Sequence, residues 1–280
     1  MMKLKGRNAI LTGANGGLGT HILEALVAQG VNVFLVGFLH PGLEAEAAMA
    51  RKHGCRADFI AADLRVPLQR ERVVLEAERA LGPIDILINN AGVEYSCAYH
   101  ELSVEQIEEV LDVNLRASML LAHRLLPGML ERGLGHIVNM ASLAGKSGPA
   151  FQEPYAASKA GLTAFTYSLR ATYRHRGVSA SVIAPGFVNA GIYARLISRM
   201  KRKAPFLLGS VGPERVSRSV VSAIQRDRPE VVISRFPVWP VLVALAIAPR
   251  LGLALVARLG THEFFRQAAE SARAEEGRKA

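Results

Sequence analysis

The stretch Asn8-Ala9-Ile10-Leu11-Thr12-Gly13-Ala14-Asn15-Gly16-Gly17-Leu18-Gly19 joins a short apolar segment to a glycine-rich turn. Beyond it, Ile22 and Leu26 keep helical spacing, and Gly30 is placed to end that helix. A strand, a glycine turn and a helix start together form an arrangement that holds a pyrophosphate over the positive end of a helix. The spacing, Gly-x3-Gly-x-Gly, differs from the commoner Gly-x-Gly-x2-Gly. An ordinary tight turn between strand and helix is the alternative.

The rest of the chain alternates apolar strands with amphipathic helices, which is typical of a parallel sheet covered by helices on both faces. Further strands are expected at 31–36, 57–61, 84–88, 136–141, 178–183 and 230–233, and long helices at 67–81 and 154–175. The pattern predicts a three-layer, doubly wound α/β (Rossmann-like) domain over 1–235, with a parallel sheet of about seven strands. Residues 236–280 are expected to form an apolar, basic helical extension with a charged tail.

The positions of cysteine and histidine in this 280-residue chain argue against a metal site or a redox-active disulfide. Cys55 and Cys97 have neither metal nor redox spacing, and the eight histidines form no ligand motif, so no metal site is expected. Two unpatterned cysteines suit a reducing compartment. No secretory signal is visible at the start of the chain, and we expect a cytoplasmic protein.

Charge is unevenly distributed along the chain. Residues 1–191 carry 18 Lys and Arg against 17 Asp and Glu, whereas residues 192–280 carry 16 against 7. The net charge of +10 therefore belongs almost entirely to the last third of the chain. A local basic face of this kind argues against a general nucleic-acid-binding protein.

A second stretch, Ser142 through Lys159, ends in Tyr155-Ala156-Ala157-Ser158-Lys159 and supplies candidate catalytic groups. Tyr155 and Lys159 are four residues apart, so on a helix they share one face. An ammonium group nearby favours the phenolate, and we expect it to lower the pKa of Tyr155 and make a general acid/base. Ser142 follows the apolar strand 136–141, so its hydroxyl and the phenol can converge on one carbonyl oxygen.

Several motifs together resemble the short-chain dehydrogenase/reductase family. They are Thr12-Gly13-x3-Gly17-x-Gly19, Asn89-Asn90-Ala91-Gly92, Asn114, Ser142, Tyr155-x3-Lys159 and Pro185-Gly186. They occur in the family's order and at its spacings, and they cover roughly residues 5–190. The resemblance implies an NAD(P)(H)-dependent oxidoreductase that transfers a hydride between nicotinamide and a carbonyl/alcohol pair.

The resemblance also implies four catalytic residues, namely Asn114, Ser142, Tyr155 and Lys159. Tyr155 would protonate the carbonyl oxygen, and Ser142 would orient that oxygen by a hydrogen bond. Lys159 would lower the pKa of Tyr155 and reach the nicotinamide ribose. Asn114 would hold a water in a proton relay behind Lys159; the alternative is a hydrogen-bonded core amide, since an asparagine on an apolar helix face is costly unless bonded.

Cofactor contacts are expected from the glycine loop and from the ends of the following strands. After the second strand, Gly37-Phe38-Leu39-His40 offers neither a carboxylate for the ribose nor an arginine for a 2′-phosphate, which favours NADP(H) modestly over NAD(H). Asp63 either accepts the adenine amino group or caps a helix. Ala190 stands where the family usually has a threonine that bonds the nicotinamide carboxamide. The full expected set is Gly13, Asn15, Gly16, Gly17, Leu18, Gly19, Phe38, Asp63, Leu64, Asn90, Ala91, Gly92, Tyr155, Lys159, Pro185, Gly186 and Val188.

Substrate contacts are expected from Glu94, Gln152, Phe187 and Tyr193. With their neighbours they form a largely apolar set, which fits a lipophilic ketone or alcohol. The basic segment around 190–210 falls where the family keeps a mobile substrate lid. The resemblance further implies a homodimer or homotetramer. Leu162, Phe165, Thr166 and Leu169 of the 154–175 helix are expected to serve packing, which includes such a subunit interface, and not to form a site.

The extension begins with fourteen apolar residues, 236–249, between Arg235 and Arg250, and stays apolar through Ala257. This run is too short to span a bilayer, and Pro240 interrupts it. Residues 236–258 either lie in a membrane interface, as a peripheral contact, or cover the substrate cleft or a dimer contact. The tail from Ala268 is charged and rich in small residues, and we expect it to fray.

Two other functions remain compatible with these patterns. One is a dinucleotide-binding regulatory or scaffold protein without turnover, against which the intact set of Asn114, Ser142, Tyr155 and Lys159 argues. The other is a peripheral membrane protein whose C-terminal segment is its main functional part.

Overall fold

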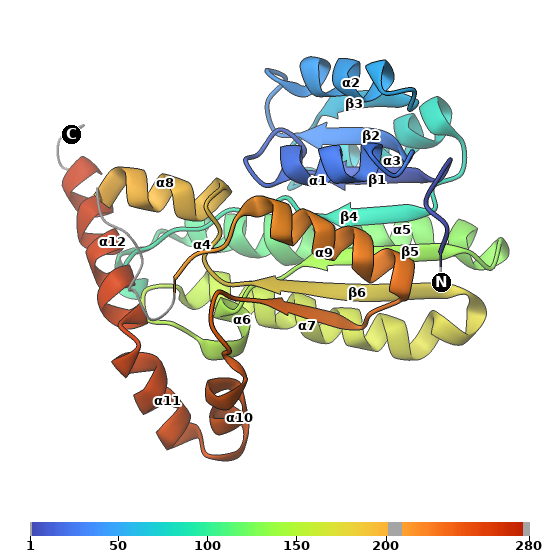
Figure 1. Ribbon diagram of the computed structural model, residues 1–280. Helices are drawn as coiled ribbons and strands as arrows, with labels where there is room; N and C mark the ends of the chain where they lie inside the picture. Colours follow the sequence, from blue (N-terminus) through green and yellow to red (C-terminus); the bar gives the residue numbers. More distant parts are fainter. Residues whose placement is uncertain (1, 201–208, 277–280) are drawn as a thin grey trace.

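A seven-stranded parallel sheet forms the centre of the computed structural model, which describes residues 2–200 and 209–276 (Figure 1). Its strand order is β3-β2-β1-β4-β5-β6-β7, and every neighbouring pair is parallel. The strands are β1 (Asn8–Thr12), β2 (Asn32–Gly37), β3 (Ala57–Ala61), β4 (Ile86–Asn89), β5 (Gly135–Met140), β6 (Val178–Pro185) and β7 (Glu230–Ile233). The predicted sheet is confirmed.

Helices connect the strands and cover both faces of the sheet. Those within the α/β domain are α1 (Gly19–Val27), α2 (Leu43–Lys52), α3 (Pro67–Leu81), α4 (Val104–Leu111), α5 (Ala117–Glu131), α6 (Ala144–Ser147), α7 (Glu153–Tyr173), α8 (Gly191–Met200) and α9 (Pro213–Arg226). Those of the extension are α10 (Trp239–Ile247), α11 (Pro249–Arg258) and α12 (Thr261–Glu276). Three short helical turns, Tyr99–Glu101, Asp112–Arg116 and Arg174–Arg176, complete the set.

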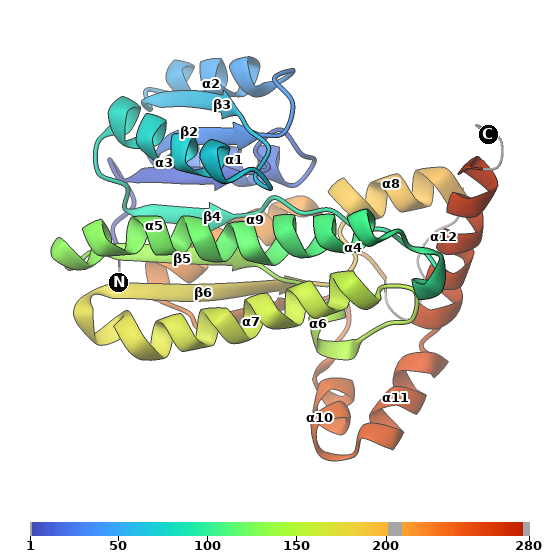
Figure 2. The ribbon, with the colours of Figure 1, turned by 180° about the vertical axis from the view of Figure 1, so that it is seen from behind.

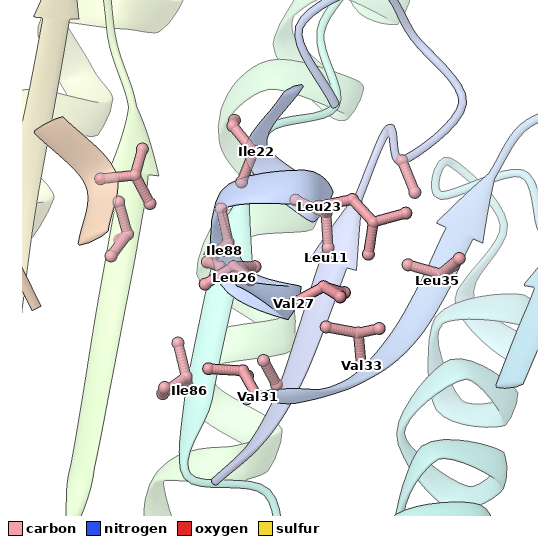
Figure 3. Packing of buried hydrophobic residues seen from close by; sticks show 14 of the residues in the cluster. Leu11, Ile22, Leu23, Leu26, Val27, Val31, Val33, Leu35, Ile86 and Ile88 are labelled. Atoms are coloured by element: carbon pink, nitrogen blue, oxygen red, sulfur yellow. The ribbon is translucent and has the colours of Figure 1, made fainter. Parts of the chain in front are cut away.

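The strands are apolar along their whole length because the sheet is buried on both faces. Helices α1, α2 and α9 pack in one core cluster on one face, and α3, α5 and α7 pack on the other (Figures 1 and 2). The apolar side of α1 lies on the central strands, where Leu23 and Leu26 meet Leu11, Val33 and Ile88 (Figure 3). Phe165 and Leu169 of α7 pack against the second cluster, as predicted.

Strand order reverses between β1 and β4, because β2 and β3 lie on one side of β1 and β5 to β7 lie beyond β4. Doubly wound sheets bind ligands at this point, outside the carboxyl ends of the strands. The glycine loop after β1 and the Asn90–Gly92 segment after β4 both leave the sheet there. The topology therefore places the two predicted cofactor motifs side by side.

The C-terminal extension leaves the sheet edge as a two-helix hairpin and returns as a third helix. Helices α10 and α11 protrude from the body, and α12 runs back to α8 (Figures 1 and 2). The hairpin closes tightly at Gly252, where a Cβ would lie 2.5 Å from the Leu245 Cα.

Helix α12 contradicts the expected fraying of the tail from Ala268 as far as Glu276, and residues 277–280 of that tail lie outside the described residues. Ala268 is fully buried, in a cluster with Phe264 and Phe265 of α12 and Tyr193 and Leu196 of α8. Small residues allow this close packing, so here they indicate contact and not disorder.

Three predictions are not decided by the fold. The domain boundary at residue 235 and the oligomer stay predictions, and residues 201–208 of the predicted lid lie outside the described residues.

Candidate active site

The glycine loop is fixed to the end of β4 by hydrogen bonds. The Thr12 hydroxyl oxygen accepts from the backbone N–H groups of Asn90 and Ala91, each at 3.0 Å. The Asn90 amide donates back to the carbonyl oxygens of Thr12 at 3.0 Å and Gly13 at 3.1 Å. Gly13 has a φ of +63°, and a Cβ there would lie 2.9 Å from the Ala91 Cα. Only glycine allows this approach.

The loop opens onto the N-terminus of α1 with little side-chain cover. A Cβ on Gly19 would lie 2.0 Å from the Gly13 carbonyl oxygen, so the turn also needs glycine there. Leu18 precedes the helix and offers no capping side chain, and the first turn of α1 contains no acidic residue. The first N–H groups of a helix have no acceptor within the helix, and the positive end of its dipole favours an anion. These features fit the pyrophosphate of a dinucleotide.

The expected catalytic side chains meet at the end of β5. The Lys159 ammonium donates to the Met140 carbonyl oxygen at 2.8 Å and lies 5.6 Å from the centroid of the Tyr155 ring. The Ser142 hydroxyl hydrogen-bonds with the Tyr155 phenol and accepts from the Ala144 N–H at 3.1 Å. Strand β5 therefore positions Ser142 and anchors Lys159, while α7 carries the phenol between them.

Burial is the largest cause of the pKa shifts of Tyr155 and Lys159. It raises the pKa of Tyr155 to about 12, with the Glu94 charge acting in the same direction and the Ser142 hydrogen bond against it. Burial also lowers the pKa of Lys159 to about 8. The expected net lowering of the Tyr155 pKa is wrong, because loss of solvent disfavours the phenolate more than the Ser142 hydrogen bond favours it. These pKa shifts favour a protonated Tyr155 phenol beside a charged lysine at neutral pH.

Asn114 lies in a π-helical turn between α4 and α5 and is completely buried. Its amide donates to the Val93 carbonyl oxygen at 2.9 Å and to the Ser158 hydroxyl at 3.1 Å, and its oxygen accepts from the Val93 N–H at 2.8 Å. The hydrogen-bonded core amide is therefore confirmed. A Cβ on Gly92 would lie 3.2 Å from the Asn114 oxygen and 3.5 Å from the Lys159 ammonium, so the two share one neighbourhood. The water relay stays a prediction.

A cavity of about 290 Å³ joins the glycine loop, the catalytic groups and the extension. The predicted residues that line it are Gly13, Gly16, Gly17, Leu18, Gly19, Asn90, Ala91, Gly92, Ser142, Gln152, Tyr155, Lys159, Pro185, Gly186, Phe187, Val188 and Tyr193. The predicted residues outside its lining are Asn15, Phe38, Asp63, Leu64, Glu94 and Asn114.

The residues expected at the adenosine end make contacts of their own. Asn15 braces the loop after β2, since its amide donates to the carbonyl oxygens of Leu39 and Pro41 at 3.0 Å each. Phe38 is 64% exposed, and Leu64 is buried in the core cluster with α3. Their cofactor roles stay predictions.

Asp63 binds a guanidinium that the sequence analysis did not single out. Its carboxylate accepts from Arg65 at 2.7–3.0 Å, and Arg65 also donates to Glu109 at 3.0 Å. The Arg65 hydrogen bonds hold the pKa of Asp63 below its usual range. The helix-capping alternative is wrong, because Val66 occupies the N-cap of α3. The Arg65 guanidinium lies 5.9 Å from the Phe38 ring, so a cation does stand near the predicted ribose site, already paired with two carboxylates.

Gln152 is a polar side chain of the predicted substrate set that lines the cavity. It is buried, and its amide donates to the Glu94 carboxylate and to the Ser96 hydroxyl, the latter at 2.8 Å. Burial raises the pKa of Glu94. The Glu94 carboxylate accepts from Gln152 and does not itself line the cavity, and its substrate contact stays a prediction.

The C-terminal extension forms part of the cavity wall. Covering the substrate cleft was one of the roles that the sequence left open for residues 236–258. Val238, Val241 and Leu242 contribute from around α10, Val256 from α11 and Phe265 from α12. The interpretation that this segment covers the cleft is therefore confirmed. Among the described residues, no helix is long and apolar enough to cross a membrane.

Comparison with known proteins decides the family. The family model described as short chain dehydrogenase matches residues 7–201. The chain belongs to the short-chain dehydrogenase/reductase family. As a short-chain dehydrogenase/reductase, it is an NAD(P)-dependent oxidoreductase that acts on C=O or CH–OH groups.

Relatives and solved structures extend this similarity across most of the chain. The ketoacyl reductase HetN of Nostoc sp. is 38% identical over 89% of this chain and 85% of its own. The 3-oxoacyl-[acyl-carrier-protein] reductase FabG of Aquifex aeolicus is 33% identical over 79% of this chain and 90% of its own. A metagenomic short-chain oxidoreductase solved in complex with NADP is 29% identical, with a TM-score of 0.69 over 83% of this chain and 98% of its own.

The pKa of Lys159 predicts a pH dependence. With a pKa of about 8, the ammonium is present below pH 8 and is lost above it. If catalysis needs the charge, kcat/KM for carbonyl reduction stays level up to about pH 8 and then falls roughly tenfold per pH unit. In Lys159→Arg, whose guanidinium stays charged, the fall moves to higher pH.

The Lys159 titration is checked directly by the ¹³Cε chemical shift of this lysine, assigned with the arginine variant. A midpoint near 8 is expected. A midpoint near the ordinary lysine value, or a rate profile that Lys159→Arg leaves in place, would contradict the account.

Proposed function

We propose that this enzyme uses NADPH to reduce the keto group of a lipophilic, ketoacyl-type substrate. The observation that carries the proposal is the single cavity that runs from Ser142 and Tyr155 to the apolar walls of α10, α11 and α12. A substrate with its carbonyl at Tyr155 would bury an apolar tail against those walls, which is favourable in proportion to the area removed from water. Two of its relatives have ketoacyl reductase in their names and another is named a 3-oxoacyl-[acyl-carrier-protein] reductase, which supports this class of substrate.

The proton-transfer groups suit reduction. When bound, the nicotinamide of NADPH supplies the hydride to the carbonyl carbon. The Tyr155 phenol, protonated at neutral pH, donates its proton to the carbonyl oxygen and completes the alcohol. Ser142 holds that oxygen in place through its hydroxyl, and the Lys159 charge stabilises the phenolate that remains.

The nicotinamide of the cofactor would be bound by backbone groups more than by side chains. The segment Pro185–Val188 is fixed by the Gly186 N–H, which donates to the Ile233 carbonyl oxygen at 2.8 Å, and by the pairing of Val188 with Val211. Ala190 follows with no hydroxyl to bond a carboxamide. Its own N–H donates to the Val188 carbonyl oxygen at 2.6 Å. We propose that the carboxamide is held by backbone groups of this segment.

The preference for NADPH is checked by placing a carboxylate after β2. In Phe38→Asp the new charge would repel a 2′-phosphate and accept from ribose hydroxyls. Affinity for NADPH should fall by roughly tenfold or more while affinity for NADH holds or rises. Titration calorimetry of both cofactors measures this, with the similarly exposed Leu68→Asp as the matched control. An unchanged NADPH affinity in Phe38→Asp would remove the case for a phosphate at this position.

Removal of the proposed acid tests the mechanism. Tyr155→Phe should lower kcat for NADPH-dependent reduction of a medium-chain 3-oxoacyl thioester by about 10² to 10⁴-fold and leave NADPH binding in place, because the phenol oxygen acts on the substrate. The exposed Tyr99→Phe is the control and should keep full activity. Retained turnover in Tyr155→Phe would show that another group supplies the proton. If the wild type bound NADPH or NADH but reduced no 3-oxoacyl thioester, the alternative of a dinucleotide-binding protein without turnover would return.

A further inference from the structure

The outer face of the α10–α11 hairpin carries large apolar side chains in solvent. Trp239 is 57% exposed and Ile247 is 79% exposed, and with Val243 they follow helical spacing along one side of α10. Leu251 and Leu253 of α11 are at least half exposed. Exposed large apolar side chains gathered on two adjacent helices are typical of an interaction site.

The inner face of the same hairpin lines the cavity. Val241 and Leu242 of α10 and Val256 of α11 line the cavity. Gly252 allows the two helices to touch, so the hairpin forms a thin two-helix wall between the cavity and solvent. The wall protrudes from the body of the protein, away from α8 and the sheet (Figures 1 and 2). Its outer apolar side chains are therefore not needed for the core.

Charge around the hairpin has one sign. No Asp or Glu occurs between Glu230 and Glu263, whereas Arg235, Arg250 and Arg258 are all present and exposed. These arginines flank or interrupt the apolar surface. A second copy of this chain seated by the same patch would bring like charges together with no carboxylate in the segment to pair with them. An anionic surface complements them.

We propose that the outer face of the α10–α11 hairpin docks on an anionic phospholipid bilayer. Trp239, Ile247 and Leu251 would enter the boundary between headgroups and acyl chains, and the arginines would contact lipid phosphates. Tryptophan favours this depth because its ring is amphipathic. Docking would also place the thin wall of the cavity against the bilayer, on the side from which a lipophilic compound arrives. The binding itself requires no substrate, so it stands or fails apart from the proposed function.

Trp239 reports on the docking directly because it is the only tryptophan in the chain. Its fluorescence should shift to the blue when vesicles of mixed phosphatidylglycerol and phosphatidylcholine are added to the full-length enzyme. Lipids brominated on the acyl chains should quench it, and the enzyme should co-sediment with the vesicles. Vesicles of phosphatidylcholine alone should bind at least tenfold more weakly, because the arginines then lack their partners.

Matched variants separate the hairpin from the rest of the surface. Ile247→Asp combined with Leu251→Asp should abolish the shift and the co-sedimentation, while Leu68→Asp with Val104→Asp, also highly exposed, should keep both. Arg250→Glu with Arg258→Glu should weaken binding to the anionic vesicles only, and Arg79→Glu should not. NADPH calorimetry on each variant verifies that it is folded.

Three results would overturn the docking surface. The first is unchanged Trp239 fluorescence with anionic vesicles while NADPH still binds. The second is equal binding to vesicles with and without phosphatidylglycerol. The third is a blue shift that grows with protein concentration in the absence of lipid and accompanies a rise in molecular mass, which would assign this face to a second copy of the chain.

Discussion

The close approach of the Gly13 turn to Ala91 is the constraint on which the site depends. Strands β1 and β4 are neighbours in the sheet, and their loops diverge from the same edge. The Thr12 hydroxyl and the Asn90 amide tie those loops together, and any Cβ at Gly13 would enter Ala91. This contact keeps the N-terminus of α1 open toward the cavity. The dinucleotide cradle is thus a consequence of strand order and of one missing side chain.

Desolvation sets the chemistry at the other end of the cavity. Strand β5 delivers Ser142 at its carboxyl end and offers the Met140 carbonyl oxygen to Lys159. Burial there raises the pKa of Tyr155 and lowers that of Lys159. In both groups it favours the uncharged form, which is the phenol of Tyr155 and the amine of Lys159. A buried phenol that keeps its proton at neutral pH is prepared to donate it. In the proposed carbonyl reduction, the direction of proton transfer would follow from this environment and not from residue identity alone.

Sequence reasoning was most successful where chemistry and periodicity coincide. The strands, the glycine loop and the convergence of Ser142 and Tyr155 were predictable, because buried parallel strands and close backbone approaches restrict the residue types allowed. The pKa of Tyr155 was not, since it depends on how much solvent the folded chain removes. The hydrogen bond between Glu94 and Gln152 was not predictable either, because a loop residue near a site can face the cavity or support a neighbour.

The C-terminal extension marks a different limit. Its apolar composition predicted a buried surface but not the surface that would cover it, and the small residues near Ala268 indicated fraying where they allow close packing on α8. The position of Arg65 beside Phe38 and Glu109 was likewise not predictable, because separate elements bring these two residues to it. In each case the missing information is a tertiary contact, which no local pattern encodes.

The central claim is that one apolar cavity, closed by α10 to α12, receives the tail of a ketoacyl substrate beside Tyr155. The most direct test is kcat/KM for NADPH-dependent reduction of 3-oxoacyl thioesters of increasing chain length. The account predicts a rise of up to roughly fourfold per methylene until the cavity is filled. It also predicts a weaker rise in Leu242→Ser with unchanged NADPH affinity. A rate constant that is independent of chain length, or the same rise in Leu242→Ser, would contradict it.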